Sequence, residues 1–379
     1  MNFEFIVPQK IIFAKDNYQK IGKIVKNYTK KLIIVTGGSS LKKSGFYDKI
    51  ILSIKEEKID FVEFNGIKGE PTPQIIDQAT DFALQNNVDC VLAIGGGSVI
   101  DTAKALAGLV TNQKGVENYL EGVGKDYKIV NSPLPFIAVP TTAGSGAEVT
   151  KNSVVTSREK KYKKSFRDDR LLAKVVIADP TLTISLPQNE TFFGGMDAIC
   201  QLIESFVTKK KNNYCQSFSS FYIPKAIDAI KKLKTDLTNI DARTIMLESS
   251  IASGITLANS GLGGVHGFAS GLGGMFDIPH GLICAILLPH ITKLNIQKNP
   301  SIYEDLALLI NKDYSNTTKL IDTLFLLNNT LEIPYDFKSF NISKDMATEI
   351  VSRSKGGSMT GNPVDFTDEE LIKFIEGLL

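Results

Sequence analysis

The chain has 379 residues, of which 43% are hydrophobic and 22% are charged, and its formal net charge at pH 7 is +2. This length predicts two domains, and the small net charge gives no general preference for nucleic acid or for a membrane surface. The longest apolar run, "GLICAILLP", is much shorter than the roughly 20 residues of a membrane helix, and the four cysteines form no CxxC pair. We therefore expect a cytoplasmic protein with reduced thiols and with neither a nucleic-acid nor a membrane partner.

Short apolar runs alternate with helical segments in the first half of the chain. The runs "KLIIVTGG", "VDCVLAIGGG", "PFIAVPTT" and "KVVIADP" are rich in β-branched residues, as buried parallel strands are. Between them, segments such as "TPQIIDQATDFALQNN" and "DTAKALAGLVTN" carry apolar residues at helical spacing. The alternation predicts a doubly wound α/β domain with a mostly parallel sheet over residues 1–184.

The loop after the first of these strands bears on the choice of a dinucleotide. Gly37, Gly38 and Ser39 stand where an acidic residue would bind the adenosine ribose and repel a 2′-phosphate. Lys42 and Lys43 follow them. A small, neutral opening with lysines behind it favours NADP over NAD, unless the two lysines are only solvated helix residues.

The second loop, "IGGGSVID", follows a strand at residues 91–94 and opens a helix at about Val99. Its glycines allow close backbone approach, so that amide groups can face a pyrophosphate at the helix N-terminus. The order of the glycines does not match GxGxxG, and a tight turn without a ligand is the alternative. The candidate cofactor-binding residues of this loop are Gly95, Gly96, Gly97, Ser98 and Asp101.

A third loop, "VPTTAGSGAEVT", brings the hydroxyl groups of Thr141, Thr142 and Ser145 together after another strand. Such hydroxyls suit contacts with a ribose or with the nicotinamide amide. Three loops of this kind on one sheet predict a dinucleotide site at the C-terminal ends of the strands. The basic segment over residues 151–170 is expected to be a solvated hairpin; alternatively, Lys164 reaches a cofactor phosphate or an anionic substrate.

Beyond residue 184 the strand-like runs stop and helical segments dominate, among them "GMDAICQLIESFVT" and "ARTIMLESSIASGITLANS". We expect an all-helical second domain over residues 185–379. Its last helix begins with Thr367 as N-cap and Glu370 completing a capping box.

All three histidines of the chain, His266, His280 and His290, lie close together in the sequence. Pro279 predicts a helix with His280 in its first turn, and the positive end of that helix dipole favours neutral imidazole, the form that binds metal. His290 is expected to be a core or capping histidine.

Asp197 and Gln201 are four residues apart on a predicted helix whose other positions are apolar. A carboxylate on such a helix is costly to bury unless it is paired or bound to a metal. An acid at the start of a helix dipole is the alternative for Asp197. Cys200 is expected to be a buried structural thiol.

Several long motifs occur in one order along nearly the whole chain: "VPQKIIF", "GGGSVIDTAK", "PTTAGSGAEVT", "ADPTLT", "GGMDA" and "HGFASGLGGMFDIPHG". In these the chain resembles the metal-dependent, iron-containing (group III) alcohol dehydrogenases, whose architecture dehydroquinate synthase shares. The resemblance implies a homodimer of chains with an α/β nucleotide domain and a helical domain, and with metal and substrate in the cleft between them. It matches Asp197, His266 and His280 with three metal-ligand positions.

Two residues depart from the family pattern. Gln201 replaces a histidine ligand; its amide oxygen is a weaker ligand than imidazole for a first-row metal. Ser270 replaces a histidine near the nicotinamide, where a hydroxyl can relay a proton but does not act as a base without activation. We expect Fe²⁺ as the metal, with Zn²⁺ or Mn²⁺ as alternatives. The segment "SMTGNP", together with Gln201, indicates a distinct subgroup.

The resemblance implies an oxidoreductase that transfers hydride between a nicotinamide coenzyme, NADP or NAD, and a small alcohol, aldehyde or ketone. A divalent metal would polarise the substrate oxygen. Two alternatives are a dehydroquinate-synthase-like enzyme that uses NAD and metal, and a nucleotide-binding protein without catalysis. The first needs a strongly basic pocket, and few basic residues stand near the ligand motifs.

Overall fold

The computed structural model describes residues 3–311 and 317–379, which form two compact units. One unit is Ile6–Leu186, and the other combines Met1–Phe5 with Pro187–Leu379. Within the second unit, Phe3 and Phe5 each pack against Tyr214, with ring centroids 5.4 Å apart. The sequence-based boundary between an α/β domain ending at residue 184 and a helical domain starting at residue 185 remains a prediction.

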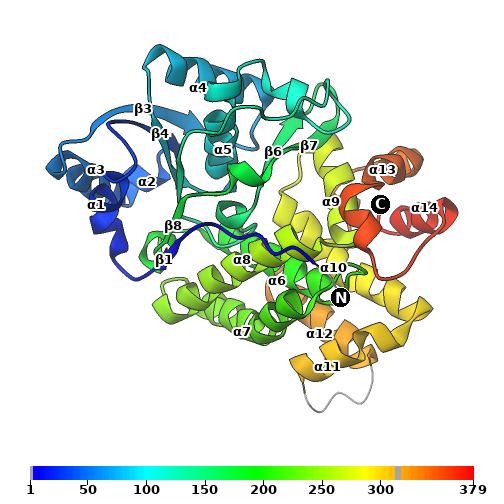
Figure 1. The fold of residues 1–379 in the computed structure, drawn as a ribbon. Helices are drawn as coiled ribbons and strands as arrows, with labels where there is room; N and C mark the ends of the chain where they lie inside the picture. The colour runs from blue at the N-terminus through cyan, green and yellow to red at the C-terminus, as the bar shows by residue number, and fades with distance from the viewer. Residues whose placement is uncertain (1–2, 312–316) are drawn as a thin grey trace. The chain divides into compact units, whose positions relative to one another are not determined.

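A six-stranded sheet forms the centre of the first unit, and every neighbouring pair of its strands is parallel (Figure 1). The strand order is β1-β8-β5-β4-β2-β3. The strands are β1 (Ile11–Phe13), β2 (Lys31–Gly37), β3 (Asp60–Ile67), β4 (Cys90–Gly95), β5 (Phe136–Pro140) and β8 (Val175–Ala178). The four predicted runs are the four central strands. The predicted α/β fold with a parallel sheet is confirmed.

Helices cover both faces of this sheet, as a doubly wound fold requires. Helices α1 (Ile21–Val25) and α3 (Phe46–Glu56) share one buried cluster with strand residues such as Leu32 and Ile94. The crossovers from β3 to β4 and from β4 to β5 run in the opposite direction to that from β2 to β3. Because such crossovers are right-handed, α4 (Pro73–Gln85) and α5 (Gly97–Asn112) lie on the other face.

The chain changes its direction of travel across the sheet between β2 and β4, which are adjacent. Ligands of doubly wound sheets bind outside the carboxyl ends of the strands at such a switch point. The loops after β2 and β4 both start there, so two of the three predicted nucleotide loops lie at the point where this fold binds ligands.

The basic segment forms an antiparallel hairpin of β6 (Asn152–Ser157) and β7 (Tyr162–Arg167), as the sequence predicts. One face of the hairpin is buried, however, because Val155 and Phe166 pack with residues of α4 and α5. Lys164, which pairs with Val155 across the hairpin, is nevertheless exposed.

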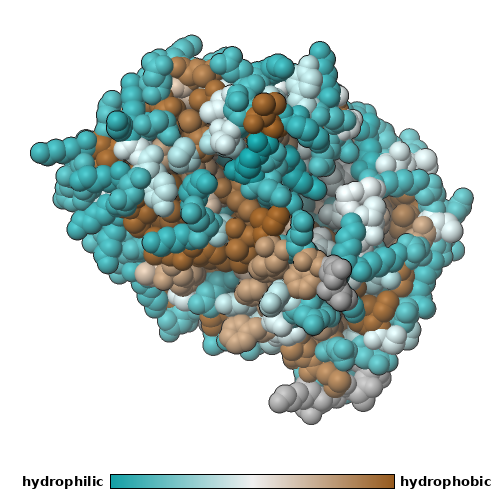
Figure 2. Space-filling view, in the orientation of Figure 1, coloured by the Kyte–Doolittle hydropathy of each residue, from teal (hydrophilic) through white to brown (hydrophobic). Residues whose placement is uncertain are grey.

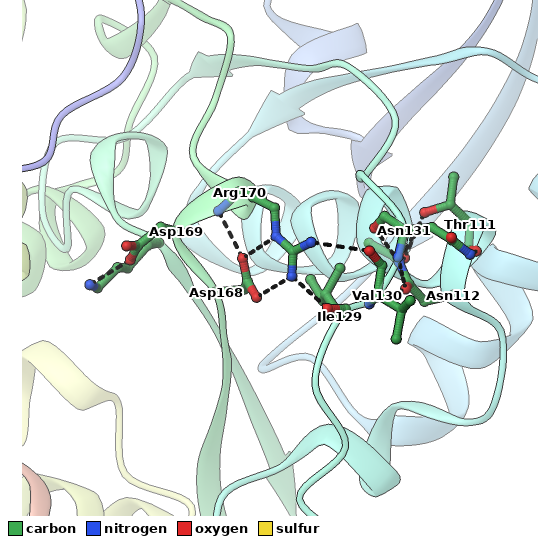
Figure 3. A network of polar contacts seen from close by, with 10 residues as sticks. Thr111, Asn112, Ile129, Val130, Asn131, Asp168, Asp169 and Arg170 are labelled. Carbon is green, nitrogen blue, oxygen red and sulfur yellow. Dashed lines mark hydrogen bonds and ion pairs between the residues drawn. The ribbon is translucent and has the colours of Figure 1, made fainter.

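A polar network fixes the irregular chain between α5 and β5 (Figure 3). The Asn112 side chain accepts hydrogen bonds from the backbone of Val130 and Asn131 at 2.8 and 2.9 Å. Arg170 makes two bonds of 2.9 Å to Asp168 and donates to the carbonyl oxygen of Ile129 at 2.6 Å. These contacts satisfy backbone groups that no strand or helix pairs.

In the part of residues 187–379 that the structure describes, the regular elements are helices, as predicted. They are α6 (Gln188–Val207), α7 (Asn213–Thr235), α8 (Ile240–Ser260), α9 (Gly264–Met275), α10 (His280–Lys298), α11 (Glu304–Ile310), α12 (Thr318–Thr330), α13 (Ala347–Ser354) and α14 (Asp368–Glu376). The capping box of Thr367 and Glu370 at the start of α14 is confirmed.

Hydrophilic side chains cover much of the face of the molecule seen in Figure 2, with hydrophobic residues in patches between them. Among the described residues, none of the helices combines the length and the apolar character that crossing a membrane requires.

Candidate metal centre and nucleotide-binding loops

Asp197 and Gln201 lie one turn apart on α6, and both side chains are buried. The amide nitrogen of Gln201 is 3.5 Å from Oδ1 of Asp197, the upper limit for a hydrogen bond. The amide oxygen of Gln201 is buried and has no hydrogen-bond partner. A buried acceptor without a donor is costly, so this oxygen is suited to a positively charged ligand.

His266, in the first turn of α9, is held in one orientation by a second carboxylate of α6. Its Nδ1–H donates to Oε2 of Glu204 at 2.6 Å, while the other oxygen of Glu204 accepts from the backbone of Val265 at 2.7 Å. With Nδ1 bonded to Glu204, Nε2 faces Asp197 and lies 3.0 Å from its Oδ1, and a metal bound there would take the place of the proton on Nε2. This arrangement prepares Nε2 to bind a metal beside Asp197.

His280 is the first residue of α10, as predicted, and its Nε2 lies 3.8 Å from Oδ1 of Asp197. Gly281 allows α10 to approach α6 at this point: a Cβ atom there would lie 2.1 Å from the carbonyl oxygen of Phe193. The contact between the two helix backbones therefore depends on glycine and brings His280 to the aspartate.

Two cysteines complete the cluster. Cys284, one turn after His280, has its Sγ 3.7 Å from Nε2 of both His266 and His280. Cys200, on α6, has its Sγ 4.0 Å from Nδ1 of His266. The ligand atoms of Asp197, His266, His280 and Cys284 all lie within 4.8 Å of one another, close enough to surround one metal ion.

The electrostatics of the cluster reflect its crowding. Burial lowers the pKa of His266, but Cys284, Asp197 and Glu204 outweigh this effect and raise that pKa well above its usual range. For the Cys284 thiol, burial acts in the other direction and raises the pKa. A hydrogen bond from Cys200 and the two imidazoles outweigh burial and bring the pKa of Cys284 well below its usual value. The imidazolium and the anionic groups thus stabilise one another, and a divalent cation that displaced the imidazole proton would stabilise the same anionic groups.

The residues present fit a divalent metal. Three nitrogen and oxygen ligands from Asp197, His266 and His280 converge, the second carboxylate orients one imidazole, and the amide oxygen of Gln201 has no other partner. These are ligand types that iron, zinc and manganese accept.

Ser270 and His290 lie outside the group of converging ligand atoms. Ser270 is half-buried on α9, one turn after His266. His290 is buried, packs against the rings of Phe325 and Tyr335 and hydrogen-bonds the carbonyl oxygen of Tyr335 at 2.8 Å, so the expected core role is confirmed.

The segment "SMTGNP" supports the helix that carries His266. Oδ1 of Asn362 accepts a hydrogen bond from the backbone of Gly264 at 3.1 Å, at the start of α9. A Cβ atom on Gly267 would lie 2.9 Å from the side chain of Met359. The segment therefore packs closely on the first turns of α9.

In the first unit, the loops after β4 and β5 touch each other. The backbone of Thr141 donates to the carbonyl oxygen of Gly95 at 3.0 Å. A Cβ atom on Gly96 would lie 3.0 Å from the Thr142 side chain, and one on Gly97 would lie 3.0 Å from the Ser145 hydroxyl. The glycines are needed for this contact, which groups Gly95–Gly97 with Thr141, Thr142 and Ser145.

The N-terminus of α5 is open. Its N-cap is Gly96, which offers no side chain to the first-turn amides of Gly97 and Ser98. A helix start of this kind binds phosphate groups. Gly37 lies close by, because a Cβ atom on it would be 3.4 Å from Val99.

Gly38 and Ser39 are exposed beyond the end of β2, as is Lys42, whose ammonium lies 4.7 Å from the centre of the Tyr47 ring. Asp101, by contrast, is buried: it accepts from the backbone of Val154 at 3.1 Å and lies 3.4 Å from the Lys104 ammonium. Its carboxylate is thus engaged with protein groups.

Sequence reasoning missed Glu204 and Cys284. Glu204 is seven residues after Asp197 on the same helix, and Cys284 is four residues after His280, so helical spacing was the available signal. Both residues stand in mainly apolar helical segments, and their partners on other helices are not visible in the sequence.

Comparison with known proteins adds an independent finding. Residues 8–180 match the family described as "Iron-containing alcohol dehydrogenase", and residues 191–379 match "Fe-containing alcohol dehydrogenase family, C-terminal". The chain is similar to the "NADPH-dependent butanol dehydrogenase" of Clostridium saccharobutylicum, with 29% identity over 98% of this chain and 97% of that protein. It is also similar to the "NADH-dependent butanol dehydrogenase A" of Clostridium acetobutylicum, with 28% identity over 97% of each chain.

A crystal structure of 1,3-propanediol oxidoreductase has the same fold, with a TM-score of 0.93 and 26% identity over the full length of both chains. The two butanol dehydrogenases carry different coenzymes in their names. The identity of the coenzyme therefore does not follow from similarity alone.

Proposed function

The chain belongs to the iron-containing alcohol dehydrogenase family, and we propose that it interconverts a small alcohol with its aldehyde or ketone, using NADP and a divalent metal. The observation that carries this proposal is the convergence of the buried Asp197 and His266 with the half-buried His280, beside the amide oxygen of Gln201 that has no hydrogen-bond partner.

The metal ligands would be Asp197, Gln201, His266 and His280. A divalent ion held by them supplies a Lewis acid that polarises the substrate carbonyl, or lowers the pKa of the alcohol in the reverse direction. The family name favours Fe²⁺, and the same ligands accept Zn²⁺ or Mn²⁺.

The protein's own groups have separate tasks. Glu204 keeps the proton of His266 on Nδ1 and so directs Nε2 toward Asp197. Ser270, one turn from His266, would relay a proton between the substrate oxygen and solvent. The open start of α5 would bind the coenzyme pyrophosphate, and Thr141, Thr142 and Ser145 would contact its ribose and nicotinamide portions.

The preference for NADP rests on the opening at Gly37 and Gly38, which has no carboxylate to repel a 2′-phosphate and has Lys42 nearby. Lys164 is exposed on β7, where it would reach a phosphate only if the hairpin borders the coenzyme. A homodimer in the cytoplasm, acting on a free small molecule, completes the proposal.

Matches of both halves of the chain to alcohol dehydrogenase families favour this reaction over a dehydroquinate-synthase-like lyase. The remaining alternative is nucleotide binding without catalysis. The deciding experiment measures the metal content of the purified protein together with NADPH and NADH oxidation over a panel of aldehydes.

We expect one bound divalent metal per chain, metal-dependent oxidation of coenzyme, and tighter binding of NADPH. Coenzyme binding without turnover in the metal-loaded protein would support the non-catalytic alternative. A preference for NADH of tenfold or more, about 1.4 kcal/mol, would contradict the interpretation of the Gly37–Gly38 opening.

A further inference from the structure

Cys284 lies on the face of α10 that carries His280 and is fully buried. Its Sγ is 3.7 Å from Nε2 of His266 and 3.7 Å from Nε2 of His280. These two nitrogens are the ones that face Asp197, so the sulfur approaches the same point in space as the metal-binding nitrogens.

The distances within this group are those of ligands around one ion. Metal–sulfur bonds of about 2.3 Å and metal–nitrogen bonds of about 2.0 Å in a tetrahedron separate sulfur and nitrogen by about 3.5 Å. Oδ1 of Asp197 lies 3.0 Å from Nε2 of His266 and 3.8 Å from Nε2 of His280, close to the roughly 3.3 Å between such oxygen and nitrogen ligands. All four ligand atoms lie within 4.8 Å of one another, so they converge on one position.

We propose that the thiolate of Cys284 is a further ligand of the metal, together with Asp197, His266 and His280. The inference rests on the metal centre of the proposed function and extends it. The amide oxygen of Gln201, a neutral and weaker donor, would then be the most easily displaced protein ligand of the ion.

Cys200 offers an internal comparison, because it is also a buried thiol beside His266. Its sulfur lies 4.0 Å from Nδ1, the nitrogen whose proton Glu204 already accepts. A metal bound through Nε2 lies on the other side of the imidazole ring. The geometry therefore favours Cys284 as the ligand and leaves Cys200 as a packing thiol.

A thiolate changes which metal the centre selects. Sulfur ligands favour zinc over hard cations such as Mn²⁺, which prefer oxygen. With one sulfur among its ligands, the centre should discriminate against Mn²⁺ more strongly than a site of nitrogen and oxygen ligands alone.

The test is titration of the full-length apo-protein with Co²⁺, whose absorption spectrum reports its ligands. We expect a sulfur-to-cobalt charge-transfer band in the near ultraviolet, in addition to the weaker visible bands of the bound ion. The charge-transfer band should vanish in Cys284→Ser and persist in both Cys200→Ser and Gln201→Leu.

The outcomes separate this inference from the proposed function. Visible bands without a charge-transfer band in the wild type would retain the metal centre and overturn the role of Cys284. A charge-transfer band that is lost in Cys200→Ser and kept in Cys284→Ser would overturn it as well. Failure of the wild type to bind Co²⁺ or Zn²⁺ at all would overturn both.

A second measurement needs no variant and so does not depend on folding of Cys284→Ser. X-ray absorption at the zinc edge of the zinc-loaded wild type should give one sulfur at about 2.3 Å and nitrogen or oxygen at about 2.0 Å. A shell with no sulfur contradicts the proposal. In competition titrations, Cys284→Ser should lower the ratio of Zn²⁺ to Mn²⁺ affinity at least tenfold, and an unchanged ratio would likewise contradict it.

Discussion

The metal cluster on α6, α9 and α10 and the nucleotide loops after β2, β4 and β5 are built from different materials. The cluster consists of buried and half-buried side chains that come from three helices. The loops offer backbone amides, small hydroxyls and the space left by missing Cβ atoms. Ligand binding in the metal cluster therefore depends on side-chain atoms, whereas binding at the loops depends on backbone groups and on the space that glycine leaves.

The difference has a practical meaning for mutation. Removing a side chain should have its largest effect in the cluster, whereas adding a single carbon to a loop glycine should lower coenzyme affinity although no side chain is lost. Each of the following variants tests one side of this contrast.

His280→Ala should give the largest effect. It removes an imidazole from a cluster that already has glutamine in place of one histidine ligand. We expect metal retention to fall sharply and turnover to drop on the order of 10³-fold, since a Lewis acid supplies several kcal/mol and each 1.36 kcal/mol is tenfold in rate. Metal analysis and initial rates measure this. The buried His290→Ala is the comparison, and an equal loss of bound metal there would refute the assignment.

Glu148→Gln tests whether a side chain also matters in the loop region, because Glu148 is a titratable residue beside the loop after β5. Burial raises its pKa from 4.5 to about 7, and one of its oxygens is buried without a hydrogen-bond partner. Because the pKa of Glu148 is higher in the folded than in the unfolded protein, the contribution of Glu148 to the free energy of unfolding is most favourable below pH 4.5. This contribution is lost as the pH rises through 7. The loss is on the order of 3 kcal/mol at 1.36 kcal/mol per pKa unit.

We expect Glu148→Gln to unfold at a higher temperature than the wild type at pH 8 and to lose most of that advantage at pH 4.5. Calorimetry at the two pH values provides the measurement. Glu159→Gln, which alters an exposed carboxylate of the same unit, serves as the control. A constant difference between Glu148→Gln and wild type at both pH values would show that ionisation of Glu148 does not contribute.

Substitutions of Gln201 should have an intermediate effect on metal affinity. Gln201→Leu removes the amide oxygen and should weaken binding about tenfold, with activity partly restored by excess metal. Gln201→His should tighten binding, because imidazole is the better ligand for first-row divalent ions. Titration of the apo-proteins decides, and equal affinity for the wild type and the leucine variant excludes Gln201 as a ligand.

Gly96→Ala should produce the smallest effect, about 1 kcal/mol of coenzyme binding energy. Its backbone angles are open to alanine, so the effect arises from a Cβ atom 3.0 Å from Cγ2 of Thr142. The double variant Gly96→Ala/Thr142→Ser removes that methyl group and should recover the affinity, while Thr142→Ser alone should bind like the wild type. Fluorescence titration with NADPH measures all three, and a double variant as weak as Gly96→Ala would refute the contact.

The sequence was most informative where burial is uniform. Strands β4, β5 and β8 are buried along their whole length, which produces the apolar runs that predicted them. The edge strands β1 and β3 were not predicted, because β1 has only three residues and β3 mixes exposed with half-buried positions. An edge strand is fixed by its neighbour, and that neighbour is not in the local sequence.

The residues of the metal cluster also differ in how well the sequence predicted them. Asp197, His266 and His280 stood out because histidine is rare in this chain and a carboxylate is unusual on an apolar helix. Cys284 did not stand out, since a thiol in an apolar stretch is usually core packing. Only the approach of α10 to α9 and α6 gives its sulfur two imidazole neighbours.

The packing of Phe5 on α7 has a consequence for how the chain is made. Phe5 stacks on Phe218, with ring centroids 6.5 Å apart, although the whole α/β unit separates them in the sequence. At roughly 5–20 residues per second, the ribosome adds the intervening residues in about 10–40 s. During that time Tyr214 and Phe218 are not yet available to Phe5. The helical unit is therefore completed late in synthesis, after the α/β unit has left the ribosome.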